Sequence, residues 1–448
     1  MKKQYKDFLY RLGVFNIKLG LKNIQNILAP LNNPHRHPRI IHLAGTNGKG
    51  STLVTIEKLL LESGYTTGAT VSPHLVTFNE RFRINGESIS DELLDEAFLK
   101  VCEACDISID NLDNYNGDSR VNPTFFEFAI SMAFYAFQQK KVDYILLETG
   151  LGGRLDASNV VENPIACVFT KIDYDHQEFL GDTLELITNE KLGILKEGAH
   201  VFVAQQQSCI LEQIQKVCDE RQFEYSMANQ NFSFHSENTE SVSYRFINLS
   251  SISHPGKKID TSIQIDGMVL KGDHQLENLS TALAVYFSVI DESSRLSNQQ
   301  IQSALEQIIW PGRIQYLNSQ KSILIDGAHN LSGMRSLLIF LDQNHASDRI
   351  LFATTWLEGK EIIPALKGFD LNRVTFLPVK IEMVGTAQIN SVSNGLIQNG
   401  YRTLPITDTD ALMTRYVLQE TDEYDLVLIG GSLYLLGEVL TRLKNESD

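Results

Sequence analysis

The feature that most constrains the fold is a strand, a glycine-rich loop and a helix that follow one another between residues 40 and 60. The apolar run at 40–44 is typical of a buried strand, and the apolar residues after position 52 recur at helical spacing. Between them lies Gly-Thr-Asn-Gly-Lys-Gly-Ser at 45–51. In such a loop, backbone N–H groups, a helix N-terminus and a lysine converge on an anion. The segment therefore predicts phosphate binding with Lys49 at the terminal phosphates; the alternative is a glycine-rich turn that binds nothing.

The loop departs from the standard phosphate-loop pattern at two positions. Leu43 stands where the pattern has glycine, and Gly50 stands where it has Ser or Thr, so that the hydroxyls come later, at Ser51 and Thr52. The segment Thr-Lys-Ile-Asp at 170–173 is similar to the guanine-reading segment of GTPases. A GTPase should also carry Asp-x-x-Gly after the intervening strand, and this chain has Glu-Thr-Gly-Leu-Gly-Gly at 148–153 instead. The pattern does not favour a generic ATPase or GTPase.

Charge and cysteine content exclude several classes of protein. The 448 residues include 39 basic and 55 acidic side chains, a net charge of −16, so we expect no nucleic-acid-binding surface. Five cysteines are an odd number in a long chain, which argues against a disulfide framework. No apolar run approaches the length of a membrane span. We therefore expect a soluble cytoplasmic protein, a monomer, that acts on small molecules and binds neither nucleic acid nor membrane.

Strand and helix signals alternate along the chain, which predicts a layered α/β fold. Short apolar runs predict central strands of parallel sheets, at 68–71, 144–148, 165–170, 322–326, 349–354, 373–377 and 426–429. Helical spacing predicts helices within the first 36 residues and at 91–105, 124–139, 280–290 and 298–309. The polar, alternating stretch 223–272 predicts β-strands. Trp-Pro-Gly-Arg at 310–313 breaks the chain, so we expect a phosphate-binding domain over 1–309 and a smaller α/β domain over 310–448.

Three polar residues follow predicted strands of the first domain. Ser72 and Glu148 lie at strand ends, and His176 comes just after the next strand. Ligands of open α/β sheets bind at this edge, and Mg²⁺ prefers oxygen donors, so Ser72 and Glu148 suit it better than His176 does. The alternatives are a helix cap for Ser72 and a solvated loop for His176.

Two further patterns have structural readings. Cys-Glu-Ala-Cys at 102–105 lies in a predicted helix with no second pair nearby, which favours a helix face over a zinc site. The aromatic cluster Phe-Phe-Glu-Phe at 125–128 is typical of a core and could also wall a flat ring ligand.

Seven segments together carry a resemblance to a known family. They stand in family order at 45–51, 72–75, 79–86, 148–156, 175–177, 190–193 and 326–330. The chain resembles folylpolyglutamate synthase and the bifunctional dihydrofolate synthase/folylpolyglutamate synthase, members of the Mur ligase superfamily, from about Gly20 to Glu438. This family places a glycine after the loop lysine. The resemblance implies an N-terminal P-loop NTPase-like Mur ligase central domain and a smaller C-terminal Rossmann-like α/β domain.

The resemblance also implies a reaction. ATP would phosphorylate the carboxylate of a folate, or of dihydropteroate, and the amino group of L-glutamate would attack the acyl phosphate to form an amide. The implied cofactors are ATP and two Mg²⁺ ions, with Lys191 carbamylated as a ligand of the second. Two alternatives stay open: a Mur-type ligase that acts on a cell-wall peptide precursor, and a nucleotide-binding regulator without turnover.

Matched position by position, the family pattern assigns site residues in this sequence. ATP would contact Gly48, Lys49, Gly50, Ser51, Asn278, Arg313 and Asp326. Magnesium would be held by Ser51, Ser72, Glu148, His176 and Lys191. The acceptor would contact Lys18, Leu21, Thr124, Phe125, Phe126, Glu127, Leu155, Asp156 and Ala157. His329 and Ser432 are candidates for the glutamate or acyl-phosphate region, and the catalytic residues would be Lys49, Lys191 and His329.

Overall fold

The computed structural model describes residues 1–13, 20–117, 119–236, 241–267, 270–359, 362–367, 370, 372–383, 385–419 and 423–447. The chain divides into two compact units. The first comprises Met1–Pro73, Phe78–Val269 and Leu276–Ile308, and the second His74–Thr77, Leu270–Gln275 and Ile309–Asp448. The sequence did not predict that His74–Thr77, Leu270–Gln275 and Ile309 would belong to the second unit. The proposed C-terminal domain starts at residue 310.

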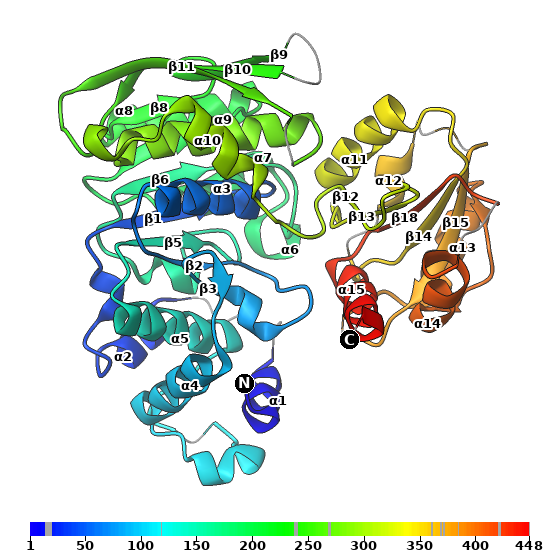
Figure 1. Ribbon diagram of the computed structural model, residues 1–448. Helices are drawn as coiled ribbons and strands as arrows, with labels where there is room; N and C mark the ends of the chain where they lie inside the picture. The colour runs from blue at the N-terminus through cyan, green and yellow to red at the C-terminus, as the bar shows by residue number, and fades with distance from the viewer. Residues whose placement is uncertain are drawn as a thin grey trace. The chain divides into compact units, whose positions relative to one another are not determined.

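The first unit is built on a mostly parallel sheet (Figure 1). Within the described residues its strand order is β4-β3-β2-β5-β1-β6-β7-β8, with β3 and β4 antiparallel. The strands are β1 (Ile40–Ala44), β2 (Thr67–Thr70), β3 (Phe82–Ile84), β4 (Glu87–Ser88), β5 (Tyr144–Glu148), β6 (Ala166–Phe169), β7 (His200–Val203) and β8 (Tyr225–Met227). An antiparallel sheet of β9 (Phe232–Ser236), β10 (Ser241–Ser250) and β11 (Lys258–Asp266) contacts β8 through β10.

Helices cover both faces of the large sheet. Helix α3 packs over β1, β2 and β5 with α10 against it, whereas α5 packs on the other face with α2 and α4 (Figure 1). The helices are α1 (Lys3–Arg11), α2 (Lys22–Leu28), α3 (Lys49–Glu62), α4 (Asp91–Cys105), α5 (Phe125–Lys140), α6 (Gln177–Leu180), α7 (Leu184–Leu192), α8 (Ser208–Glu220), α9 (Asp273–Val289) and α10 (Asn298–Glu306). Opposite crossover directions from β1 to β2 and from β2 to β5 place α3 and α5 on opposite faces.

The second unit is a smaller α/β layer. Its sheet has the order β12-β13-β18-β14-β15-β16, with β17 beside β15, and only β12 antiparallel among the described strands. The strands are β12 (Gln315–Tyr316), β13 (Ile323–Asp326), β14 (Ile350–Thr354), β15 (Val374–Lys380), β16 (Arg402–Thr403), β17 (Thr407–Asp408) and β18 (Leu426–Gly430). The helices are α11 (Leu331–Asn344), α12 (Ile363–Leu366), α13 (Ile389–Gln398), α14 (Thr409–Leu412) and α15 (Leu433–Ser447).

The predicted α/β fold is confirmed, and local chemistry explains why several elements begin where the sequence predicts. Ser90 caps α4, accepting a hydrogen bond from the Leu93 N–H at 3.3 Å. Thr124 and Glu127 form a capping box at the start of α5. The prediction for α9 was wrong at its start, which is Asp273 rather than Ser280, because its first turns are polar and carry little apolar periodicity. The β3–β4 hairpin and β7 were not predicted.

A buried ion pair joins α3 to the β3–β4 hairpin. The Glu57 carboxylate is 1% exposed and accepts hydrogen bonds from Arg83 Nε at 2.7 Å and from the Gly86 N–H at 3.2 Å. Replacing Arg83 by methionine would leave this carboxylate buried and unpaired, so we expect the free energy of unfolding to fall by about 3–5 kcal/mol. Urea denaturation measures the loss. Adding Glu57→Gln should restore part of it, and a double variant no more stable than Arg83→Met would contradict this account.

Two buried histidines predict that acid destabilises the fold. Burial lowers the pKa of His42 to about 3 and that of His200 to about 4, from an ordinary 6.5. Below about pH 6.5 the unfolded chain binds protons at these two histidines, whereas the folded chain does not. The free energy of unfolding is therefore highest above pH 6.5 and falls as the pH is lowered towards 4. At pH 5 each histidine should cost about 2 kcal/mol. Urea unfolding of the wild type and of His200→Gln at pH 7 and 5 tests this, since the variant should lose less stability on acidification.

Candidate active site

The glycine-rich loop lies between β1 and α3, at the centre of the large sheet. Gly48 has a φ of +89° and precedes Lys49, the first residue of α3. The N–H groups of Thr46 and Asn47 donate to the Lys171 carbonyl at 2.7 and 3.1 Å. Thr46 Oγ1 also donates to the Asp173 carbonyl at 2.8 Å. The segment 170–173, which is similar to a GTPase motif, therefore holds the loop in place through backbone hydrogen bonds.

Two lysines converge on the carbonyl of one loop residue. Lys49 Nζ donates to the Gly45 oxygen at 3.0 Å, and Lys191 Nζ, from α7, donates to the same oxygen at 2.9 Å. Burial, and secondarily the charge of Lys49, lower the pKa of Lys191 to about 7, whereas Asp175 and Asp156 act in the opposite direction. Near neutral pH a large fraction of the Lys191 amine is therefore uncharged, which is the nucleophilic form.

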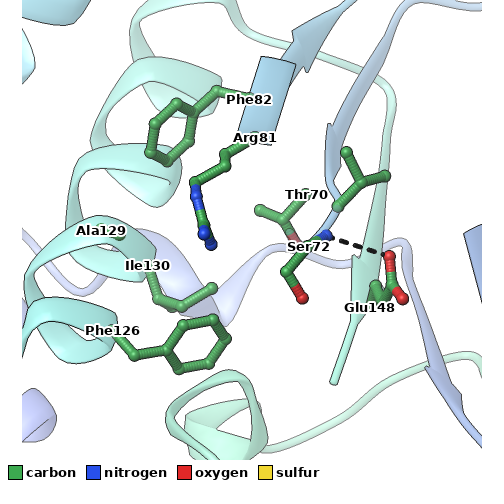
Figure 2. Close-up of a pocket in the computed structure, with 9 residues that line it drawn as sticks. Thr70, Ser72, Arg81, Phe82, Phe126, Ala129, Ile130 and Glu148 are labelled. Carbon is green, nitrogen blue, oxygen red and sulfur yellow. Dashed lines mark hydrogen bonds between the residues drawn. The ribbon is translucent and has the colours of Figure 1, made fainter. Parts of the chain in front are cut away.

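Glu148 and Ser72 meet at the carboxyl ends of β5 and β2. Glu148 is 6% exposed; its Oε2 accepts a hydrogen bond from the Ser72 N–H at 3.2 Å, and its Oε1 lies 3.8 Å from Lys49 Nζ. Figure 2 shows both side chains at one side of a small pocket. Phe82, Phe126 and Ile130 form its apolar wall, and Arg81 is its cation among the described lining residues. The predicted proximity of Ser72 and Glu148 is thus found in the structure.

His176 and Ser51 lie at the starts of two helices, His176 at the N-cap of α6 and Ser51 in α3. His176 has a left-handed φ of +50° at the start of α6, and its N–H donates to Asp175 Oδ1 at 2.9 Å. Asp175 in turn acts electrostatically on Lys191. Ser51 is 3% exposed in the first turn of α3.

The donor set at this edge fits Mg²⁺. Across the described ranges, no three His, Cys, Asp or Glu side chains gather closely enough to hold a metal ion alone. Mg²⁺ keeps several waters and takes one or two carboxylates together with phosphate oxygens of a substrate. A buried carboxylate beside a serine and a phosphate loop, as at Glu148 and Ser72, is such a set.

The residues assigned to the acceptor fall into two groups. Thr124 and Glu127 cap α5, and Glu127 Oε2 also accepts a hydrogen bond from Asn23 Nδ2 at 2.8 Å. Both side chains therefore stabilise the start of this helix. Phe126 lines the pocket and packs on Gly150, where a Cβ would lie 2.6 Å from the ring. Phe125 is 2% exposed, Leu21 precedes α2, and Lys18 lies outside the described residues.

Asp156 ties together the loop after β5. Its carboxylate accepts from the Leu151 N–H at 2.8 Å and from Ser158 Oγ at 2.6 Å, and burial raises its pKa. Leu155 and Ala157 flank it, with Ala157 6% exposed.

Asn278, in α9, lies against the phosphate loop at Gly48. A Cβ at Gly48 would lie 2.2 Å from Asn278 Oδ1.

The C-terminal candidates gather around Asp326 in the second unit. Asp326 Oδ1 accepts from the Ala328 N–H and Oδ2 from the Ile314 N–H, each at 2.8 Å. Ile314 follows Arg313 and has a φ of +44°, a strained conformation for a β-branched residue. His329 Nδ1 lies 2.7 Å from the Gly327 carbonyl. Ser432 follows β18, whose Gly430 is the register partner of Asp326.

Comparison with known proteins decides the family. A model of the Mur ligase middle domain matches residues 43–286. The dihydrofolate synthase/folylpolyglutamate synthase of Bacillus subtilis is 31% identical over 452 residues, covering 96% of each chain. The chain belongs to this Mur ligase family. The folylpolyglutamate synthase of Lacticaseibacillus casei is 31% identical over 72% of each chain.

Solved structures of the family agree with the fold of this family member. E. coli FolC in complex with DHPP and ADP superposes with a TM-score of 0.81 at 25% identity, covering 99% of this chain and 97% of that one. The Yersinia pestis bifunctional folylpolyglutamate synthase/dihydrofolate synthase with Mn, AMPPNP and L-glutamate bound gives 0.78 at 27% identity, covering 98% of both. None of the described helices of this ligase family member is long and apolar enough to cross a membrane.

One side chain at this family member's site had no role in the sequence predictions. Arg81, at the end of the 3₁₀ helix Phe78–Arg81, is 7% exposed and lines the pocket with Ser72 and Glu148. Its segment, 79–86, carried part of the family resemblance without a residue assignment. An arginine directly before Phe82, the first residue of a strand, is the signal that could have singled it out.

Proposed function

We propose that this chain is an ATP-dependent ligase that joins L-glutamate to the carboxylate of a folate, and of dihydropteroate. The acceptor carboxylate takes the γ-phosphoryl group of ATP, which leaves ADP and an acyl phosphate. The neutral amine of glutamate then attacks the acyl carbon, loses a proton and expels phosphate. The observation that supports this most is the convergence of Lys49, Lys191 and Glu148 on a phosphate loop, in a family whose named members are folate ligases.

Each residue that the family pattern assigns has a proposed task. Lys49 and the loop N–H groups hold and neutralise the phosphoryl oxygens. Ser51, Ser72, Glu148 and His176 hold Mg²⁺, which withdraws charge from the transferring phosphoryl group when bound. Carbamylated Lys191 supplies an anionic oxygen for a second Mg²⁺. Asn278, Arg313 and Asp326 contact ATP, and His329 and Ser432 serve the glutamate side.

The compartment and assembly also belong to the proposal. All five cysteines are free thiols, four of them buried, which suits a reducing compartment. We assign the protein to the cytoplasm, as a monomer with small-molecule substrates. Size-exclusion chromatography with light scattering tests the monomer, and a dimer at micromolar concentration would contradict it.

The decisive experiment couples phosphate release to amide formation. Purified protein with Mg-ATP, labelled L-glutamate and either dihydropteroate or tetrahydrofolate should release phosphate in proportion to new amide. Phosphate release indifferent to both organic substrates would indicate a simple NTPase, and tight ATP binding without turnover a regulator. Activity with UDP-linked peptide acceptors instead of pterins would indicate a cell-wall ligase, an alternative that the named relatives do not favour.

A glycine substitution tests the loop itself. Gly48→Ala should lower ATP affinity about 10-fold or more, because the left-handed backbone costs about 1–2 kcal/mol with a Cβ and that Cβ meets Asn278. Calorimetric titration with ATP measures the change. Gly64→Ala is the matched control, since its φ is +88° with nothing within 4 Å. It should lower stability and leave ATP affinity unchanged; equal affinities in all three proteins would contradict the assignment.

A further inference from the structure

The pocket at the edge of the large sheet combines one apolar wall with two opposite charges. Phe82, Phe126 and Ile130 face Ser72 and Glu148 across it, and Arg81 extends between them (Figure 2). All of these residues belong to the first unit. The pocket therefore offers a flat apolar surface, a cation and the candidate magnesium ligands within one cavity.

Arg81 is held in this position from both ends. Its carbonyl accepts a hydrogen bond from the Val71 N–H at 3.1 Å, which fixes its backbone beside the residue that precedes Ser72. Its guanidinium lies over the Phe125 ring, 5.1 Å from the centroid. Stacking of this kind orients the planar fork of an arginine. With 7% exposure, the charge is almost withdrawn from water.

The proposed reaction requires a carboxylate to enter this pocket. Glu148 is an acid in the same cavity, and it would repel an anionic acceptor unless a cation lay on the acceptor's other side. Arginine suits that task because its fork matches the two oxygens of a carboxylate. Phe126 and Ile130 present a surface for the apolar or aromatic group that bears the carboxylate.

We propose that Arg81 binds the carboxylate of the acceptor and holds it beside Ser72 and Glu148, so that Arg81 selects acceptors that carry an anion at this point. The assignment rests on the proposed ligase function. Once one oxygen of the acceptor is phosphorylated, the remaining carbonyl oxygen stays against the guanidinium. Negative charge grows on that oxygen as the amine adds, so Arg81 also stabilises the tetrahedral intermediate.

The test compares a carboxylate acceptor with its neutral amide. Calorimetric titration measures the dissociation constants of dihydropteroate and of dihydropteroate carboxamide, under identical conditions, for the wild type and Arg81→Met. The wild type should bind the carboxylate at least about 10-fold tighter than the amide, as loss of a charge-assisted pair implies. In Arg81→Met the ratio should fall to near one. Contributions of bound magnesium to the ratio are common to both proteins and cancel in the comparison.

Matched variants separate recognition from packing. Arg39→Met removes another arginine that stacks on an aromatic ring, 5.2 Å from the Tyr144 centroid and outside the pocket, and should leave both constants unchanged. If Arg81→Met does not fold, Arg81→Gln replaces it with the same expectation. Equal weakening of both ligands in the Arg81 variant, with the ratio kept, would overturn the proposal and make Arg81 a packing residue.

The outcome also distinguishes this proposal from the proposed function. If the wild type forms the glutamate amide and the ratio persists in the variant, the role of Arg81 alone fails. If the wild type binds neither compound and forms no amide, the ligase function and the role of Arg81 fail together. In steady-state kinetics, Arg81→Met should raise KM for the acceptor and lower kcat, whereas KM for ATP should not change.

Discussion

Replacing Lys49 by methionine is expected to lower the rate of ATP-dependent acyl phosphate formation by at least about 10³-fold. Methionine keeps the length of the side chain and removes its charge. Lys49 Nζ now lies 3.0 Å from the Gly45 carbonyl and 3.8 Å from Glu148, at the start of α3, where the phosphate oxygens are expected. Without that cation, the negative charge that develops on the transferring phosphoryl group is less stabilised in the transition state.

Single-turnover measurement of ADP formation with saturating acceptor gives the rate directly. Lys58→Met is the matched control: it lies on the same helix, pairs with Glu62 at 2.6 Å, and should leave the rate unchanged. Calorimetric titration of ATP should show weaker binding by a much smaller factor than the loss in rate. A Lys49→Met enzyme within a few-fold of the wild-type rate would contradict the role assigned to this lysine.

The sequence was most informative where local and long-range signals agree. β1, α4 and β5 each lie within a residue of their predicted bounds, because buried parallel strands and capped helices have strong local patterns. The β3–β4 hairpin was missed since its strands are three and two residues long. Strands this short show no sequence periodicity. The hairpin is stabilised instead by the ion pair of Arg83 with Glu57, a residue distant in the sequence.

The sequence predicted which strand ends carry the site residues. It did not predict the individual contacts between their side chains. Register explains the first part: Leu43 of β1 pairs with Glu148 of β5, so an acid at that strand end must lie beside the phosphate loop. The hydrogen bond from Lys191 to the Gly45 carbonyl joins residues 146 positions apart, and no pattern within one sequence specifies it. Arg81 escaped notice for the same reason, because its place in the pocket depends on stacking over Phe125.

Lys191 provides the second large effect. Lys191→Ala should lower ligase activity by at least about 100-fold, since the proposed carbamate would be lost as a magnesium ligand. In the wild type, carbon dioxide from isotopically labelled bicarbonate should add to the neutral amine, which then loses one proton to give the carbamate. Because burial lowers the pKa of Lys191 to about 7, labelling should be weak at pH 6 and rise through pH 8 as the amine becomes neutral.

A half-buried neighbour makes this prediction specific. Burial also lowers the pKa of Lys196, so Lys196→Met removes a second lysine that burial makes nucleophilic while leaving the pocket residues in place. Label should persist in Lys196→Met and disappear in Lys191→Ala. Formate or acetate, small enough to enter the space left by the deleted side chain, should restore part of the activity of Lys191→Ala and none to Lys49→Met. Full activity of the wild type after exhaustive removal of bicarbonate would show that the uncharged amine itself suffices, and that Lys191 acts through its hydrogen bond to Gly45.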